Sequence, residues 1–366
     1  MSFLWVGEGS TRMFGRWLQR QGPGKAAYAL LLLLSSAGHA AWGAPTDNVV
    51  YQTPNTFEPH SGPAHMIHNL SLFVIQITGA IFIVVAALFV YVVIRFRQRD
   101  PSDDSEPPQV YGSTQIELAW TVIPILIVLV LFLTTARILF AIQDQKMPPT
   151  AVDADVVGHQ FWWEFHYPKY GFTTADELHV PVSTEQVPTT TSLRLLSADV
   201  DHSFWVPQLF GKIDSIPNQV NHMWFNPDKV GLYVGQCAQF CGVEHAKMLL
   251  RVYVQTPEDF AAWVKNQQQP GVQDPAVAEG RQIFESQACI SCHVVRGTPA
   301  QGKFGPDLTH FMSRDTLASG VADNTPANLK LWIKDPDYVK PGSLMPAMQL
   351  SDDQIDKVVA YLDTLK

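Results

Sequence analysis

Two long runs without a charged side chain constrain the fold of this 366-residue chain more than any other feature. No Asp, Glu, Lys or Arg occurs from Asn69 to Ile94 or from Leu118 to Ala136. About 20 consecutive apolar residues suffice for a helix to cross the hydrocarbon of a bilayer. The sequence therefore predicts two membrane spans, at about 69–94 and 115–138, joined as a hairpin.

Arginines indicate how the hairpin is oriented. The connection between the spans begins with Arg95, Arg97 and Arg99, whereas no Lys or Arg occurs from residue 40 to residue 94. Basic residues are enriched in cytoplasmic loops, so the connection is predicted to be cytoplasmic and everything after the second span to lie outside. Arg137, just after the second span, reduces this contrast without reversing it.

The N-terminus has the features of an export signal. Basic residues precede an apolar run at 26–40 that is too short to span a bilayer and ends in small residues. We predict a signal peptide over 1–40, cleaved near Ala40, with a retained signal anchor as the alternative. An exported segment and the hairpin then occupy 41–147, and later cysteines meet an oxidising compartment.

After the hairpin the residue pattern of the sequence changes. Residues 148–256 contain short alternating or β-branched runs separated by Pro, Gly and Asn, which is typical of a β-sandwich or small barrel. Thr256 and Pro257 begin a helix, and the polar stretch "QQQPGVQDP" is an interdomain linker, so helix and linker occupy 257–273.

The tail, residues 274–366, is predicted to be helical. Helix-start signals occur at Asp274, Thr325 and Ser351, the last with Gln354 as a capping box. The formal net charge of −9 argues against nucleic acid as a partner, because phosphate binding needs a basic surface.

The pentapeptide "CISCH" at Cys289, Cys292 and His293 is the attachment signature of a c-type haem. Both thiols would bond the haem covalently, and the histidine would bind iron from one side. Met345 is the candidate for the opposite axial position, with Met348 as its alternative. A redox-active cysteine pair or a disulfide is the competing interpretation.

The stretch "GQCAQFCGVEHAKM" combines soft ligands in one loop. Cys237, Cys241, His245 and Met248, with His202 upstream, suit copper better than hard cations, whereas zinc gains little from a thioether. Two thiolates could bridge two copper ions. The alternatives are a disulfide between the cysteines or a copper-delivery protein.

The order of these features resembles that of cytochrome c oxidase subunit II, and the tail is similar to that of caa-type haem–copper oxidases, in which a cytochrome c domain is fused to this subunit. The resemblance implies a multidomain membrane protein with a transmembrane hairpin, an all-β cupredoxin domain and an all-α class I cytochrome c domain. It also implies a binuclear copper A centre with six ligands: the side chains of His202, Cys237, Cys241, His245 and Met248 and the carbonyl of Gln239.

The sequence departs from the family pattern at two positions. Most relatives have Glu between the two cysteines, where its carboxylate also binds magnesium at the contact with subunit I, but this chain has Gln239. Relatives also have Trp in the motif "GHQW" as the point where electrons arrive, but this chain has Phe161. Trp162 or Trp163 could substitute, or these aromatics could fill the core.

Glu117, at the cytoplasmic start of the second span, matches the family pattern "LExxWT". That match implies a role near the mouth of a proton channel in subunit I. A solvated charge at a helix end is the competing interpretation.

The resemblance implies the subunit through which electrons enter a respiratory terminal oxidase, an oxidoreductase and translocase whose oxygen-reducing site lies in another subunit. Electrons would pass from haem c to copper A and on to subunit I. The implied partners are oxidase subunits I and III and, as donor, cytochrome c or the preceding respiratory complex. We expect a bacterial inner membrane, with both metal domains on the periplasmic face. The alternatives are the copper A subunit of a nitric oxide reductase and a membrane-tethered electron shuttle.

Overall fold

The computed structural model describes residues 53–98, 102, 106, 108–109, 111–143 and 151–366. The predicted signal peptide, at 1–40, lies outside the described residues.

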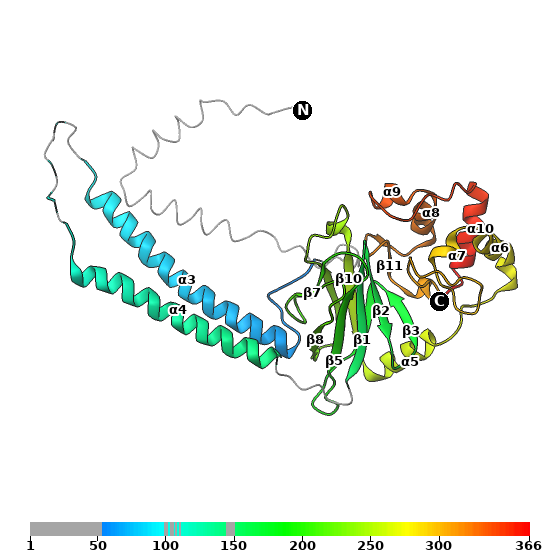
Figure 1. Ribbon diagram of the computed structural model, residues 1–366, viewed down its shortest axis with the longest axis horizontal. Coiled ribbons are helices and arrows are strands. Elements are labelled where there is room, and N and C mark those ends of the chain that lie inside the picture. The colour runs from blue at the N-terminus through cyan, green and yellow to red at the C-terminus, as the bar shows by residue number, and fades with distance from the viewer. Residues whose placement is uncertain (1–52, 99–101, 103–105, 107, 110, 144–150) are drawn as a thin grey trace. The chain divides into compact units, whose positions relative to one another are not determined.

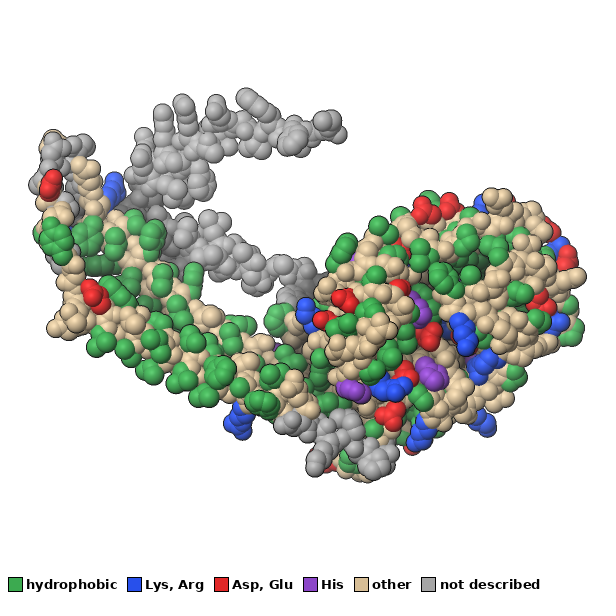
Figure 2. Space-filling view, viewed as in Figure 1, with side chains coloured by type: hydrophobic (Ala, Val, Ile, Leu, Met, Phe, Trp, Pro, Cys, Tyr) green, Lys and Arg blue, Asp and Glu red, His purple; other side chains and the backbone are tan. Residues whose placement is uncertain are grey.

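Two long helices form the predicted hairpin. Helix α3 (Gly62–Arg95) and helix α4 (Thr114–Gln143) run side by side (Figure 1), and both extend beyond the uncharged runs. Both are long and apolar enough to cross a membrane. Figure 2 shows hydrophobic side chains over most of their visible surface, as expected of helices whose surroundings are lipid.

The outer ends of the hairpin are bonded to the β-domain. The backbone N–H of His60 donates to the carbonyl of Gln208 at 2.7 Å, and that of Gly62 donates to Asn226 Oδ1 at 3.0 Å. At the end of α4, Trp224 Nε1 donates to the carbonyl of Ile142 at 2.7 Å. The start of α3 and the end of α4 therefore lie on the side of the β-domain, as the predicted topology requires.

Two five-stranded sheets build the β-domain in the part of the chain that the structure describes. The first has the order β3–β2–β1–β5–β8, with bounds Phe172–Ala175, Trp162–Tyr167, Val152–His159, Thr191–Ser197 and Asn221–Phe225. The second has the order β4–β10–β9–β6–β7, with bounds Glu177–Pro181, Leu249–Gln255, Gly231–Cys237, His202–Trp205 and Ile213–Ser215. Each sheet is mixed, because β1 pairs with β5 and β10 with β4 in parallel.

Alternating side chains of both sheets fill one core. In β2, Trp163, Phe165 and Tyr167 are all fully buried, as the period of a strand dictates. Phe204 of β6 packs edge-on against Trp163 and Phe165 from the other sheet. The predicted β-sandwich is therefore confirmed.

Helix α5 (Pro257–Gln267) follows the sandwich and is capped by Thr256, whose Oγ1 accepts from the N–H of Asp259 at 3.1 Å. The tail then contains helices with the bounds Ala278–Ser286 (α6), Cys289–Cys292 (α7), Pro326–Lys334 (α8), Pro336–Val339 (α9) and Asp352–Leu362 (α10). Helix α10 contacts both α6 and α8, and a second core includes Phe284, Leu329 and Ile355.

Two details of the tail differ from the sequence prediction. Asp274 caps a short 3-10 helix, η3 (Pro275–Val277), and the α-helix begins only at Ala278. A two-residue ladder of β11 (Thr316–Leu317) and β12 (Ala322–Asp323) interrupts the helical pattern. The predicted capping box at Ser351 and Gln354 is present.

Candidate copper and haem centres

Five side chains of the predicted copper cluster converge at one edge of the second sheet. The two cysteine Sγ atoms lie 3.9 Å apart, and neither cysteine is in a disulfide. His202 Nδ1 lies 3.9 Å from Cys237 Sγ, and His245 Nδ1 lies 3.7 Å from Cys241 Sγ. Met248 Sδ is 3.9 Å from Cys241 Sγ, and the thiol of Cys237 donates to the carbonyl of Gln239 at 3.2 Å.

Neighbouring strands bring these ligands together. Cys237 ends β9, and its N–H donates to the carbonyl of Met248, immediately before β10. Between these strands, the 3-10 helix η2 (His245–Lys247) turns His245 toward Cys241. His202 is the first residue of β6, where pairing of β6 with β9 holds it beside Cys237.

Asp199, in the stretch "SADVDHSFWVP", is a functional residue that was not predicted from the sequence. Its Oδ1 is 2.7 Å from His202 Nε2. A carboxylate accepts, so Nε2 carries the proton and Nδ1 offers its lone pair toward the thiols. Orientation of a ligating histidine by an outer carboxylate is a recurring feature of metal sites. The position of Asp199 three residues before His202 is the sequence signal that could have identified it.

Electrostatics favour one thiolate in the cluster. The hydrogen bond between the two cysteine sulfurs, helped by that with His202, lowers the pKa of Cys237. Burial opposes charge on His202, but bonding to Cys237 and Asp199 outweighs it and raises the pKa of this imidazole. Cys237 is therefore the thiol that ionises first, and a thiolate is the form that binds metal.

The donor set fits copper. Among the described His, Cys, Asp and Glu side chains, only His202, Cys237 and Cys241 form a group of three with ligand atoms all within 4.8 Å of one another, and all three are buried. The thioether of Met248 is fully buried and completes a soft set. Two thiolates, two imidazoles and a thioether suit copper better than magnesium or calcium.

The residues predicted to hold haem line one cleft of the tail. Both cysteines of the "CISCH" motif, His293, Met345 and Met348 contribute to it, together with apolar residues of α6, α8 and α10. His293 Nδ1 lies 2.8 Å from the carbonyl of Pro306, which fixes the ring and leaves Nε2 for iron. Burial lowers the pKa of His293, which keeps the imidazole neutral as a ligand must be. These residues fit a covalently bound haem. Because Met345 and Met348 both line the cleft, the choice of Met345 stays a prediction.

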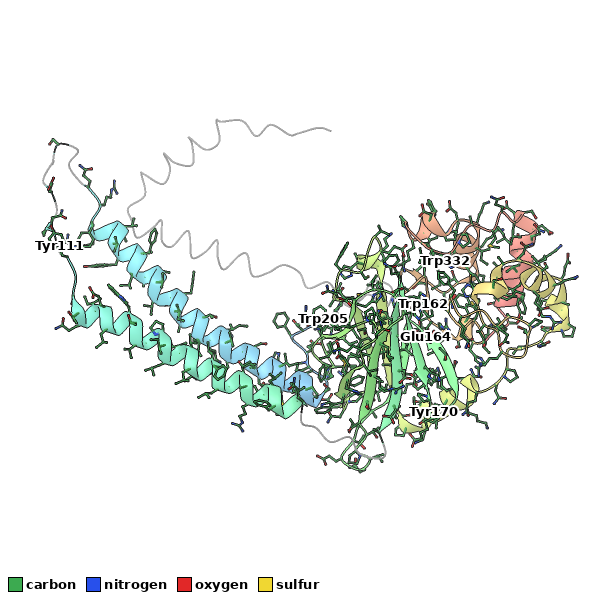
Figure 3. The ribbon with its side chains drawn as sticks, in the orientation of Figure 1. Tyr111, Trp162, Glu164, Tyr170, Trp205 and Trp332 are labelled. Carbon is green, nitrogen blue, oxygen red and sulfur yellow. The ribbon has the colours of Figure 1, made fainter. Side chains whose placement is uncertain are left out.

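Two of the three aromatic residues proposed for electron transfer also line this cleft. Phe161 and Trp162 border it, together with Gln160 and Glu244. All four belong to the β-domain, which is called the copper domain below because it carries the predicted copper ligands. The ring of Phe161 packs over Gly242, next to Cys241, so closely that a Cβ there would lie 2.9 Å from it. Figure 3 marks Trp162 on β2. Trp163 instead points into the core and contacts His202 edge-on, with ring centroids 5.9 Å apart.

Glu117 lies far along the chain from both centres. It is exposed in the first turn of α4. The structure places none of the described ligands beside it, and its role stays a prediction.

Comparison with known proteins matches each part of the chain. The family model for the cytochrome c oxidase subunit II transmembrane domain matches residues 53–138, that for its periplasmic domain matches 152–255, and that for cytochrome c matches 277–366. The fold and site thus define a membrane-anchored electron-transfer protein with a copper domain and a cytochrome domain.

Individual relatives agree with these matches. The cytochrome c oxidase subunit 2 of Alkalihalophilus pseudofirmus is 37% identical over 317 residues, which cover 84% of this chain and 90% of that protein. That of Bacillus subtilis is 32% identical, covering 85% and 92%. The crystal structure of the periplasmic domain of subunit II (CoxB) of Bradyrhizobium japonicum is 29% identical, covers 34% of this chain and 97% of that chain, and has a TM-score of 0.31. The chain belongs to the cytochrome c oxidase subunit II family.

Proposed function

We propose that this chain is the subunit through which electrons enter a terminal oxidase, which reduces oxygen to water in another subunit. Electrons from cytochrome c or the preceding respiratory complex arrive at the haem domain, continue to the copper domain and leave to subunit I. When bound, haem c and the binuclear copper centre supply one-electron redox chemistry. The chain fixes the distance, orientation and dryness of their sites.

One observation carries this proposal: Phe161 contacts both sites. It lines the haem cleft on one side. On the other it packs over Gly242 of the copper loop, which is the segment 237–248 that carries most of the predicted copper ligands. Its side chain is 7% exposed, so water is kept out of the contact. Gln160, one residue earlier, bonds the carbonyl of Cys241 at 2.7 Å. A buried aromatic in direct contact with both sites is the natural route between them.

Substitution of Phe161 tests the route. Phe161→Leu keeps an apolar side chain but removes the aromatic ring, and Phe161→Trp supplies the residue that the family pattern has. We expect slower reduction of copper after rapid reduction of the haem in Phe161→Leu, and a rate near that of the parent in Phe161→Trp. Phe260→Leu, in the buried face of α5, is the matched control. Equal rates in Phe161→Leu and the parent would contradict the route.

The copper-ligand assignments belong to this proposal: His202, Cys237, the carbonyl of Gln239, Cys241, His245 and Met248. The exposed side chain of Gln239 offers an amide in place of a carboxylate, so we propose that this chain holds magnesium more weakly than relatives with Glu do. Cys289, Cys292, His293 and Met345 are the proposed haem ligands.

The exposed tip of the copper loop is the proposed contact with subunit I. Phe240 and Val243 are 76% and 81% exposed, a high value for apolar side chains beside a metal site. With subunits I and III, the complex would lie in a bacterial inner membrane, with the copper and haem domains on the periplasmic side.

A second function shares most of these features. In a nitric oxide reductase, the same kind of copper subunit would serve a different catalytic subunit. Purification of the chain with its partner, followed by assays with oxygen and with nitric oxide, distinguishes them. Oxygen consumption supports the oxidase, whereas turnover with nitric oxide alone supports the reductase. Purification without a larger haem protein would favour a membrane-tethered shuttle.

A further inference from the structure

Lys340 is a cation buried where the haem domain meets the copper domain. It follows helix α9 and precedes the predicted haem ligand Met345 by five positions. Its side chain is 4% exposed. The ammonium donates to the carbonyl of Phe161 at 2.7 Å, across 179 positions of the chain. It also lies 3.5 Å from Oε2 of Glu244, which is 2% exposed.

Both partners of Lys340 belong to the copper side of the proposed route. Phe161 is the residue in contact with both sites, and Glu244 immediately precedes the predicted copper ligand His245. The ammonium of Lys340 therefore connects the segment before Met345 to Phe161 and to the copper loop.

A buried charge needs such partners. Desolvation of an unpaired ammonium costs several kcal/mol, and removal of one member of a buried pair leaves the other uncompensated. Burial lowers the pKa of Lys340, while the carboxylates of Glu244 and Asp176 act in the opposite direction. The Lys340–Glu244 pair itself adds little to the free energy of unfolding, because desolvation offsets the attraction. Its geometry instead specifies a single arrangement of the three segments.

The turn after Lys340 makes a second contact with the copper loop. Gly342 has a φ of +95°, and a Cβ at this position would lie 2.7 Å from Cγ2 of Val243. A glycine therefore allows the turn both its conformation and its close approach. Lys340 and Gly342 thus place the haem-ligand segment against residues 243 and 244.

We propose that Lys340 is a positioning residue for electron transfer within this chain. It holds the segment that carries Met345 in one place against Phe161 and the copper loop, so that transfer takes place in a single docked geometry. This inference rests on the proposed function.

Other contacts hold the two domains together without Lys340. Glu177 Oε1 accepts from the N–H groups of Asp315 and Thr316 at 2.9 and 3.0 Å. The backbone N–H of Leu249 donates to the carbonyl of Ser319 at 3.2 Å. Loss of Lys340 should therefore loosen the docking around Met345 without releasing the haem domain.

The test uses the intact oxidase complex loaded with copper and haem. The variants are Lys340→Met, Glu244→Gln and the double variant, which removes both charges and so avoids leaving one of them buried without its partner. Lys330→Met is the matched control, because Lys330 forms an exposed ion pair with Asp356 within the haem domain. The haem is reduced rapidly by a photoreductant, and its reoxidation by copper is followed optically. Hydrogen exchange is measured over residues 340–345.

We expect Lys340→Met and the double variant to slow the step by on the order of tenfold, as small displacements of reacting groups do. Exchange over 340–345 should rise, while copper and haem contents and the copper resonance spectrum stay as in the parent. Lys330→Met should match the parent in every readout. An unchanged rate in both Lys340→Met and the double variant would overturn the inference while leaving the proposed function intact. Absence of haem-to-copper transfer in the parent itself would contradict the proposed function, and the inference with it.

Discussion

The side-chain amide of Gln160 donates to the backbone carbonyl of Cys241 at 2.7 Å, which ties the turn between β1 and β2 to the copper loop. The backbone N–H of the same residue donates to Asp199 Oδ2 at 2.6 Å. Gln160 therefore contacts both a predicted ligand and the residue that orients another, His202. Gln160 therefore links the proposed aromatic route to the predicted copper site, through both its side-chain amide and its backbone N–H.

Gln160→Ala should loosen the copper loop. The carbonyl of Cys241 loses its donor, which should lower the free energy of unfolding by about 1 kcal/mol. Copper should then be lost faster to a chelator. The measurement is the rate of copper loss from the periplasmic part of the chain. Gln269→Ala is the control, because the side-chain amide of Gln269 donates to the carbonyl of Lys265 in α5, away from the copper loop. Equal rates in parent and Gln160→Ala would contradict the assignment.

Asp199→Ala should weaken copper binding although Asp199 is not a ligand. Without the carboxylate, His202 is free to rotate and to change tautomer, and loss of such outer partners lowers metal affinity by about 10–100-fold. Competition with a copper chelator measures the effect. Asp201→Ala, two residues later and exposed, should bind copper like the parent. If both variants behave alike, Asp199 does not orient His202.

The contact of the haem domain with Glu177 should depend on pH. Burial, with a smaller contribution from the nearby Asp315, raises the pKa of Glu177 from 4.5 to about 7. The folded state then holds this proton more tightly than the unfolded chain does. Stability should therefore fall as the pH rises from about 4.5 to about 7, by on the order of 3 kcal/mol from this group.

Glu177→Gln removes this dependence because the amide does not titrate. Its carbonyl can still accept from Asp315 and Thr316. Thermal unfolding of the fragment 151–366 at several pH values measures the effect, with the exposed Glu258→Gln as control. A pH profile of Glu177→Gln that matches the parent would show that another group is responsible.

Glu117→Ala should slow proton-coupled turnover of the assembled oxidase and leave copper content intact. The residue lies in the first turn of α4, at the end of the hairpin away from the copper domain. Oxygen consumption and metal analysis of the same preparation measure both quantities. Unchanged turnover would reduce Glu117 to a solvated charge at a helix end.

Local signals in the sequence predicted much of this molecule. The spacing of Cys237, Cys241, His245 and Met248 places them close together in the sequence. Both cysteines of "CISCH" lie on the short helix α7, and the histidine follows it directly. Helix caps at Thr256, Thr325 and Ser351 were predicted because a cap acts over three residues.

The missed features depend on contacts across the chain. The bond between Lys340 and Phe161 joins residues 179 positions apart, and that between Glu177 and Thr316 joins residues 139 apart. Nothing in the neighbourhood of Lys340 or Glu177 distinguishes either from a surface charge. The roles of Phe161, Trp162 and Trp163 also could not be separated, because a turn at the start of β2 decides which ring faces the haem cleft.

The central claim is that the copper loop holds a binuclear centre beside a haem domain. Its most direct test is electron paramagnetic resonance of the periplasmic part of the chain, loaded with copper and haem, together with copper and iron analysis. We expect two coppers per haem and hyperfine splitting from one electron shared by both nuclei. A single copper with a four-line signal, or no copper and a disulfide between Cys237 and Cys241, would contradict it.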